Sequence, residues 1–324
     1  MSSPITRRRR HLLAAEFVTV AFMGLVAVAA KFTGVGLLLF PELSSLSFDV
    51  LARPRGKWAS QPLRLIATPL LTGAMGLFVT RHMRYGALAI LLIVVLCLAT
   101  IRLLRSAIGP AISAGLLPFV LGERHWLYPP AIAAGLVTLA GVLWLWKRWS
   151  LRANGLPPET EAISIDDTLE SSSRDRFWLI HLLAFVAVLG LAGEWTGLRF
   201  LLFPPLVVMA YELLAHPEVP AWIEQPVFFP LVCFLTASTG LLALRTLGHS
   251  PLGVLLTVAV SIALLQIFRM HMPPALAVGL LPFVSPSPDL WFPVSVGIGT
   301  SVLSVWFSVR SRFAQPALSK AIEG

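Results

Sequence analysis

The sequence predicts an all-α fold, a polytopic bundle of transmembrane helices built from two tandem repeats. Composition is the first reason: 56% of the 324 residues are hydrophobic, 13% are charged, and the mean hydropathy is +0.81. A soluble protein is about one-quarter charged. The second reason is an internal repeat, because eight of the eleven residues in 110–120 recur in 274–284. We expect four full-length helices and two short, proline-interrupted helices in each copy.

The first copy, residues 1–149, starts with a basic run followed by an apolar run, as a secretory signal does. However, residues 29–41 resemble residues 192–204, which lie in the middle of the chain. We therefore expect the first helix to be retained. Six elements are expected in this copy, at residues 11–32, 36–52, 61–80, 86–104, 110–120 and 128–146. The segment 110–120 is about half as long as the ~20 residues of a spanning helix.

A polar linker over residues 150–175 precedes the second copy, residues 176–312, and a tail, residues 313–324. The linker carries six of the sixteen acidic residues of the chain and a run of three serines, which are typical of solvated segments. Six elements are again expected, at residues 177–195, 201–216, 225–244, 251–268, 274–284 and 291–309. Matching residues of the two copies, such as Arg105 and Arg269, lie 164 positions apart (269 − 105).

The basic clusters predict the orientation. If both short segments cross the membrane, or both turn back, each copy has an even number of crossings. The basic residues of the linker and of both ends then share one side, as the positive-inside rule prefers. We expect parallel copies in the inner (plasma) membrane, with cytoplasmic N- and C-termini. The alternative, inverted copies, needs an odd count.

The formal net charge of +9 does not indicate a nucleic-acid partner, because the basic residues lie at the ends of apolar runs. The expected partners are the lipid bilayer and a small anion, and a homo-oligomer is compatible with the sequence. Cys97 and Cys233 lie inside apolar runs, where thiols usually pack as small hydrophobic groups. Neither a disulfide, nor a metal site, nor a cofactor is expected.

The short proline-bounded segments supply the candidate substrate-binding site. Proline suits a first helical turn, and the N–H groups after it present a partial positive charge to an anion. We expect an anion between these helix starts, with Pro274, His271 and Arg269 in the second copy and Pro110 and Arg105 in the first. Alternatively, the prolines only end a helix, the arginines reach the headgroups, and His271 is an interfacial histidine.

The Phe-Pro segments are the expected facing elements, with Phe40 in one copy and Phe203 and Pro204 in the other. Glu42 would repel a nearby anion unless it were protonated. Glu42 and Glu212 are therefore candidate proton-coupling carboxylates, the alternative being interfacial groups at helix ends. Gln61 and Gln225 each precede a proline at a helix start, where the amide either caps the helix or contacts a ligand.

Three motifs carry a family resemblance: Leu202-Phe-Pro-Pro205, Gln225-Pro226 and His271-Met-Pro-Pro-Ala275 followed by Gly279. In order and rough spacing they resemble the HPP family of integral membrane proteins. The histidine here is separated from the prolines by Met272, and the first copy lacks it. Members of that family from plastids and cyanobacteria are regarded as nitrite transporters, so the resemblance implies nitrite transport.

We therefore expect a transporter or channel for a small solute, an inorganic anion such as nitrite, and not an enzyme. One alternative is a membrane enzyme that uses His271, Glu42 and Glu212 as acid-base groups. The sequence has no zinc-protease or phosphate-loop motif to support this alternative. The other alternative is a membrane-embedded interaction protein that transports nothing.

Overall fold

The structure, a computed structural model, describes residues 4–153, 177–216 and 227–322. All regular elements in these ranges are helices. Six of them are long and apolar enough to cross a membrane: α1 (Pro4–Thr33), α4 (Pro62–His82), α7 (Tyr128–Ala153), α9 (Trp178–Thr196), α11 (Phe228–Leu247) and α14 (Trp291–Ile322). Large apolar side chains such as Phe17, Leu103 and Leu242 are exposed on them or on their neighbours. The chain is a helical, multi-pass membrane protein.

Two of the eight helices expected to be full-length are shorter than the others. Helices α5 (Ala87–Leu103) and α12 (Pro251–Ile267) have 17 residues each. At 1.5 Å per residue, such a helix measures roughly 25 Å, somewhat less than the ~30 Å hydrocarbon core of a bilayer. Helices α7 and α14 are longer than expected, because they continue past the expected ends at residues 146 and 309.

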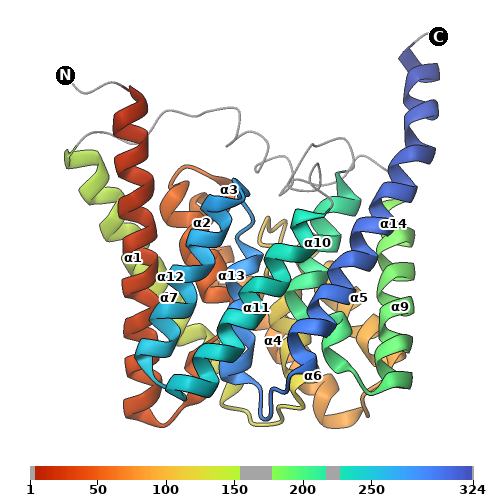
Figure 1. Cartoon of the computed structure of the whole chain (residues 1–324), viewed down its shortest axis with the longest axis horizontal. Coiled ribbons are helices and arrows are strands. Elements are labelled where there is room, and N and C mark those ends of the chain that lie inside the picture. Colours follow the sequence, from red (N-terminus) through yellow and green to blue (C-terminus); the bar gives the residue numbers. More distant parts are fainter. Residues whose placement is uncertain (1–3, 154–176, 217–226, 323–324) are drawn as a thin grey trace.

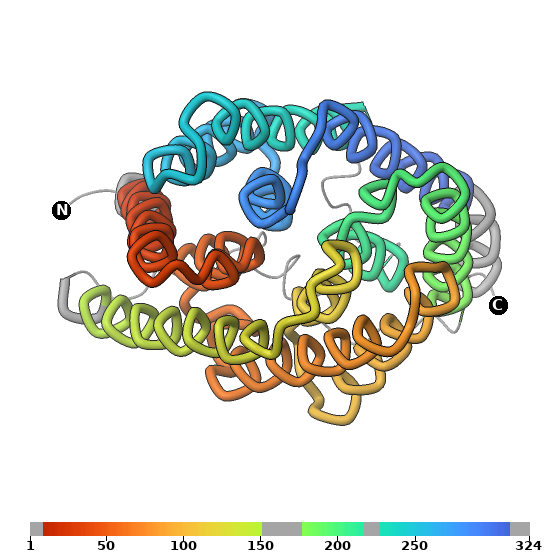
Figure 2. The backbone as a smooth tube through the Cα atoms, turned by 90° about the horizontal axis from the view of Figure 1, so that it is seen from below, coloured from red at the N-terminus to blue at the C-terminus, as the bar shows by residue number. Residues whose placement is uncertain are grey.

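The short segments form helices inside the bundle. They are α2 (Glu42–Ala52), α6 (Ala111–Leu121), α10 (Pro204–Ala215) and α13 (Pro274–Val284). Figure 2 shows the longer helices as a ring around these four. All residues of α2 are buried, as are residues 111–120 of α6 and 274–283 of α13. The 3-10 turns η1 (Gly36–Leu38) and η2 (Arg199–Leu202) lead into α2 and α10, and the one-turn helix α3 (Lys57–Ser60) follows α2.

Two helix pairs approach closely through glycines. Helix α4 packs against α6, and α11 packs against α13. A Cβ on Gly76 would overlap the Gly115 carbonyl oxygen, and a Cβ on Gly240 would overlap that of Gly279. Small residues allow such close backbone approach in membrane helices. The glycine at each crossing is what lets a short helix lie this close to a long one.

Contacts between the two halves of the chain join the short helices. Helix α2 contacts α13, and α10 contacts α6. On the outside of the bundle, α1 contacts α12, and α5 contacts α9. The start of α1, helix α3 and the end of α14 lie on the same side of the bundle (Figure 1), which is called the α3 side below.

Candidate functional site

The starts of α2 and α6 meet inside the bundle. Glu42, the first residue of α2, is 2% exposed, and Ser113 in the first turn of α6 is fully buried. The Ser113 hydroxyl donates a hydrogen bond to Glu42 Oε1. Two helix N-termini, each with a partial positive charge, thus converge on one carboxyl group. This pair is the centre of the candidate site.

The starts of the other short helices lie beside the same elements. Ser45, in the first turn of α2, donates a hydrogen bond to the Pro273 carbonyl oxygen, 2.6 Å away, at the start of α13. Gly109 precedes α6, and a Cβ placed on it would lie 3.4 Å from Glu212 Oε1 of α10. Each of α2 and α10 therefore contacts the start of a short helix from the other half of the chain.

The first N–H groups of these helices are already hydrogen-bonded within the chain. The donor–acceptor distance is 3.0 Å for Leu43 N–H to Phe40 C=O, for Ile112 to Gly109, and for Leu276 to Pro273. These turns differ from the expectation that the N–H groups after the prolines are available to an anion. The helix dipoles still place positive potential at the site, but a ligand cannot use these particular donors.

A charged cluster lies two turns along α2 from Glu42. The Arg53 Nε–H donates to Asp49 Oδ1 over 2.9 Å, and both residues are buried. His271 Nε2 lies 3.8 Å from the same oxygen, and its ring stacks on Phe48 with centroids 5.4 Å apart. Sequence reasoning singled out His271 but missed Asp49 and Arg53. An acid and a base four residues apart in an apolar segment were the available signal.

The two arginines expected to bind the anion lie outside this cluster. Arg105 and Arg269 are exposed, and each follows the end of a helix, α5 or α12. Their φ angles, 48° and 53°, lie in the left-handed region that favours glycine. The structure does not bring either guanidinium group to the Glu42–Ser113 pair.

The remaining predicted residues are placed as follows. Gln61 Oε1 lies 3.4 Å from the Ala107 N–H, in the connection that leads to α6, so its amide reaches the approach to the site. Gln225 lies outside the described residues. The other predicted residues, all buried at starts of α2, α6, α10 or α13, are Phe40, Phe203, Pro110, Pro204 and Pro274.

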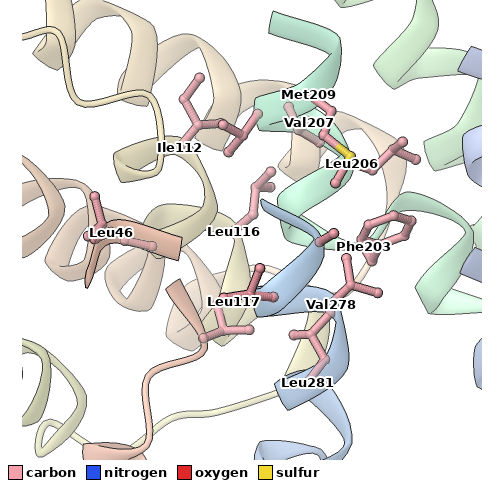
Figure 3. Packing of buried hydrophobic residues seen from close by; sticks show 14 of the residues in the cluster. Leu46, Ile112, Leu116, Leu117, Phe203, Leu206, Val207, Met209, Val278 and Leu281 are labelled. Atoms are coloured by element: carbon pink, nitrogen blue, oxygen red, sulfur yellow. The ribbon is translucent and has the colours of Figure 1, made fainter. Parts of the chain in front are cut away.

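Apolar side chains pack between the short helices next to the site. Figure 3 shows Leu117 of α6, Val278 of α13 and Leu206 of α10 among them. Leu206 and Val278 are fully buried, and Leu117 is 2% exposed. These side chains offer no hydrogen-bond partner to water or to an ion, so a charged solute placed among them would lose its hydration without compensation.

Across the described ranges, no group of three or more His, Cys, Asp or Glu side chains is arranged to hold a metal ion. The Glu42–Ser113 pair and the cluster around Asp49 supply carboxyl, hydroxyl, imidazole and guanidinium groups. Comparison of the chain with family models, with curated proteins and with solved structures gave no match.

Proposed function

We propose that the protein transports a small inorganic anion, of the nitrite class, together with a proton. The observation that carries this proposal is the meeting of the α2 and α6 N-termini at Glu42 inside the bundle. Short helices whose N-termini end at mid-membrane recur in transporters that bind anionic groups. The resemblance to the HPP family supports nitrite as the substrate.

Glu42 gives the proposed coupling its physical reason. An ionised Glu42 and a mobile anion would compete for the positive ends of the same helices, because both are negative. A proton on Glu42 removes the repulsion, so the anion and the proton enter together. The Ser113 hydroxyl serves either state of the carboxyl group, since a hydroxyl can donate or accept a hydrogen bond.

The exposed arginines have a different role in this proposal. Arg105 and Arg269 sit where α5 and α12 end, immediately before the segments that lead to α6 and α13. Positive charges at an entrance raise the local concentration of anions. The arginines thus attract the substrate, and the positive potential of the helix N-termini holds it.

The proposal includes a duplicated architecture in parallel orientation, with the α3 side facing the cytoplasm. Matched contacts in the two halves support it, since Trp146 donates to the Leu51 carbonyl oxygen and Arg310 donates to that of Leu214. The donors are 164 residues apart (310 − 146) and the acceptors 163 (214 − 51). Opening the apolar layer near Leu117 and Val278 would then require the two halves to move against each other.

Flux measurements test the proposed function. The purified full chain is reconstituted in liposomes, and uptake of nitrite, nitrate, formate and chloride is followed with and without an inward proton gradient. We expect uptake of at least one of these anions above the empty-vesicle rate, stimulated by external acid. Uptake equal to that of empty vesicles for all four anions would refute transport.

A further inference from the structure

One face of α2, together with the residue that follows the helix, carries four buried polar residues, here called the α2 stripe: Glu42, Ser45, Asp49 and Arg53. They are spaced by three, four and four residues, which keeps them on one face of a helix with 3.6 residues per turn. Polar and charged groups inside a membrane protein are costly and mark ion or proton pathways. The stripe therefore requires an explanation beyond packing.

The α2 stripe connects a buried group with an exposed one. At its inner end Glu42 contacts Ser113, and in its middle Ser45 donates to the Pro273 carbonyl oxygen. At its outer end His271 approaches Asp49, and 37% of the His271 side chain is exposed. Helix α2 ends near α3, so the stripe runs from the candidate site toward the α3 side (Figure 1).

The other half of the chain lacks such a stripe. The positions 163 residues further on, in and after α10, hold Pro205, Val208, Glu212 and His216. The first two carry no proton-transferring group, so the polar line stops at Glu212. The full set of polar residues is therefore a feature of the first half of the chain alone.

We infer that the α2 stripe, with His271 at its outer end, is the route by which protons pass between Glu42 and the α3 side. The inference rests on the proposed function, which requires a proton on Glu42. It adds the path that the proton takes to Glu42, the side from which the proton enters, and the half of the molecule that conducts the proton.

The proton transfers balance at each step. A proton from water converts His271 to the imidazolium, which passes it to the Asp49 carboxylate and becomes neutral again. Asp49 then passes the proton to the Ser45 hydroxyl oxygen, while the Ser45 O–H turns away from the Pro273 carbonyl oxygen and releases its own proton toward Glu42. Glu42 ends as the neutral acid, and the other groups return to their starting states. Neighbouring groups on a helix face have Cβ atoms ~5–6 Å apart, a gap that one hydrogen-bonded water spans.

The groups around the stripe fit these roles. Asp49 faces Arg53 on its own helix and His271 from the segment before α13. Asp49 thus lies between a fixed positive charge and a partly exposed imidazole, the arrangement that a relay between His271 and the stripe needs. Glu42 faces Ser113 of α6 and, at longer range, Tyr128 of α7, whose hydroxyl donates to the Ala114 carbonyl oxygen over 2.6 Å.

The test compares serines on two faces of the same helix. Ser45→Ala removes a hydroxyl from the stripe. Ser44→Ala removes an equally buried hydroxyl from the opposite face of α2, where it donates to the Pro41 carbonyl oxygen over 2.7 Å. Asp49→Asn is the second stripe variant and keeps the shape of the side chain. In proteoliposomes, a trapped pH dye reports anion-driven proton uptake, and isotopic nitrite exchange at equal pH reports anion movement alone.

We expect Asp49→Asn and Ser45→Ala to slow proton uptake, by up to about a hundredfold for the carboxyl group, and to leave nitrite exchange intact. Ser44→Ala should match the wild type in both assays. Proton uptake at the wild-type rate in both stripe variants overturns this inference and leaves the proposed function intact. If Asp49→Asn does not fold, Ser45→Ala against Ser44→Ala decides. If the wild-type protein shows no anion-driven proton uptake, the proposed coupling and this inference both fail.

Discussion

At the scale of single residues, Arg105 and Arg269 occupy positions whose backbone conformation favours glycine, although the proposed function needs a positive charge at both. Each adopts a left-handed φ, which costs a non-glycine residue on the order of 1 kcal/mol. The residue after each arginine closes the end of the helix with a backbone hydrogen bond. The Ser106 N–H donates to the Ile101 carbonyl oxygen, and the Met270 N–H donates to the Leu265 carbonyl oxygen, both over 2.9 Å. Glycine is the usual residue there, so an arginine needs another reason.

We predict that Arg269→Gly raises the thermal stability of the purified protein, by up to about 1 kcal/mol after the entropy cost of glycine. The same variant should lower anion uptake at low salt, because the entrance loses a positive charge. Arg269→Lys should keep most of the uptake and none of the stability gain. A stability gain with unchanged uptake would mean that Arg269 has no part in transport.

At the scale of helices, the glycine crossings decide whether the short helices reach the interior. Gly76 lies against the Gly115 carbonyl, and Gly240 lies against that of Gly279. Because a backbone carbonyl cannot move aside as a flexible side chain can, a larger residue must push the two helices apart.

We predict that Gly76→Ala or Gly240→Ala destabilises the protein, by roughly 1–3 kcal/mol as overpacked sites do. Gly141→Ala is the matched control, because a Cβ there meets nothing within 4 Å. Thermal unfolding in detergent, followed by tryptophan fluorescence, measures the difference. Equal midpoints for Gly76→Ala and Gly141→Ala would contradict the close crossing of α4 and α6.

The sequence predicted the short helices well, because prolines bound them and their lengths fall far below a membrane span. It could not predict their contacts. The Glu42–Ser113 pair joins residues 71 positions apart, and the Ser45–Pro273 bond joins residues 228 positions apart. Such pairs depend on how the halves pack. Arg105 and Arg269 were predicted to bind the anion because charged residues are rare in this chain. Their exposure follows from the left-handed ends of α5 and α12, which the local sequence does not reveal.

At the scale of the whole molecule, the direction of the chain through the bundle fixes which groups share a side. Helix α3 lies on the side where α1 starts and α14 ends (Figure 1). The segment through α2 therefore returns the chain to that side, as expected if both short segments of a half cross the membrane. Turning back instead would leave Ser60 on the opposite side.

We predict that a cysteine introduced by Ser60→Cys reacts with an impermeant maleimide from the α3 side, the cytoplasmic side in our proposal. A cysteine introduced by Ser287→Cys, in the exposed connection after α13, should react from the other side. Cys97 and Cys233 are both buried, so replacing them with alanine gives a silent background. Labelling of both introduced cysteines from one side would contradict this topology.

The most direct test of the central claim, that one proton on Glu42 accompanies each anion, is the voltage dependence of nitrite uptake. Proteoliposomes with a potassium gradient and valinomycin set the membrane potential, while the inward proton gradient is kept constant. One proton with one anion carries no net charge, so uptake by the wild-type protein should not change with the potential. Glu42→Gln, which cannot ionise, should lose stimulation by the proton gradient, and any uptake it retains should follow the potential. Wild-type uptake that follows the potential as Glu42→Gln does would contradict the account.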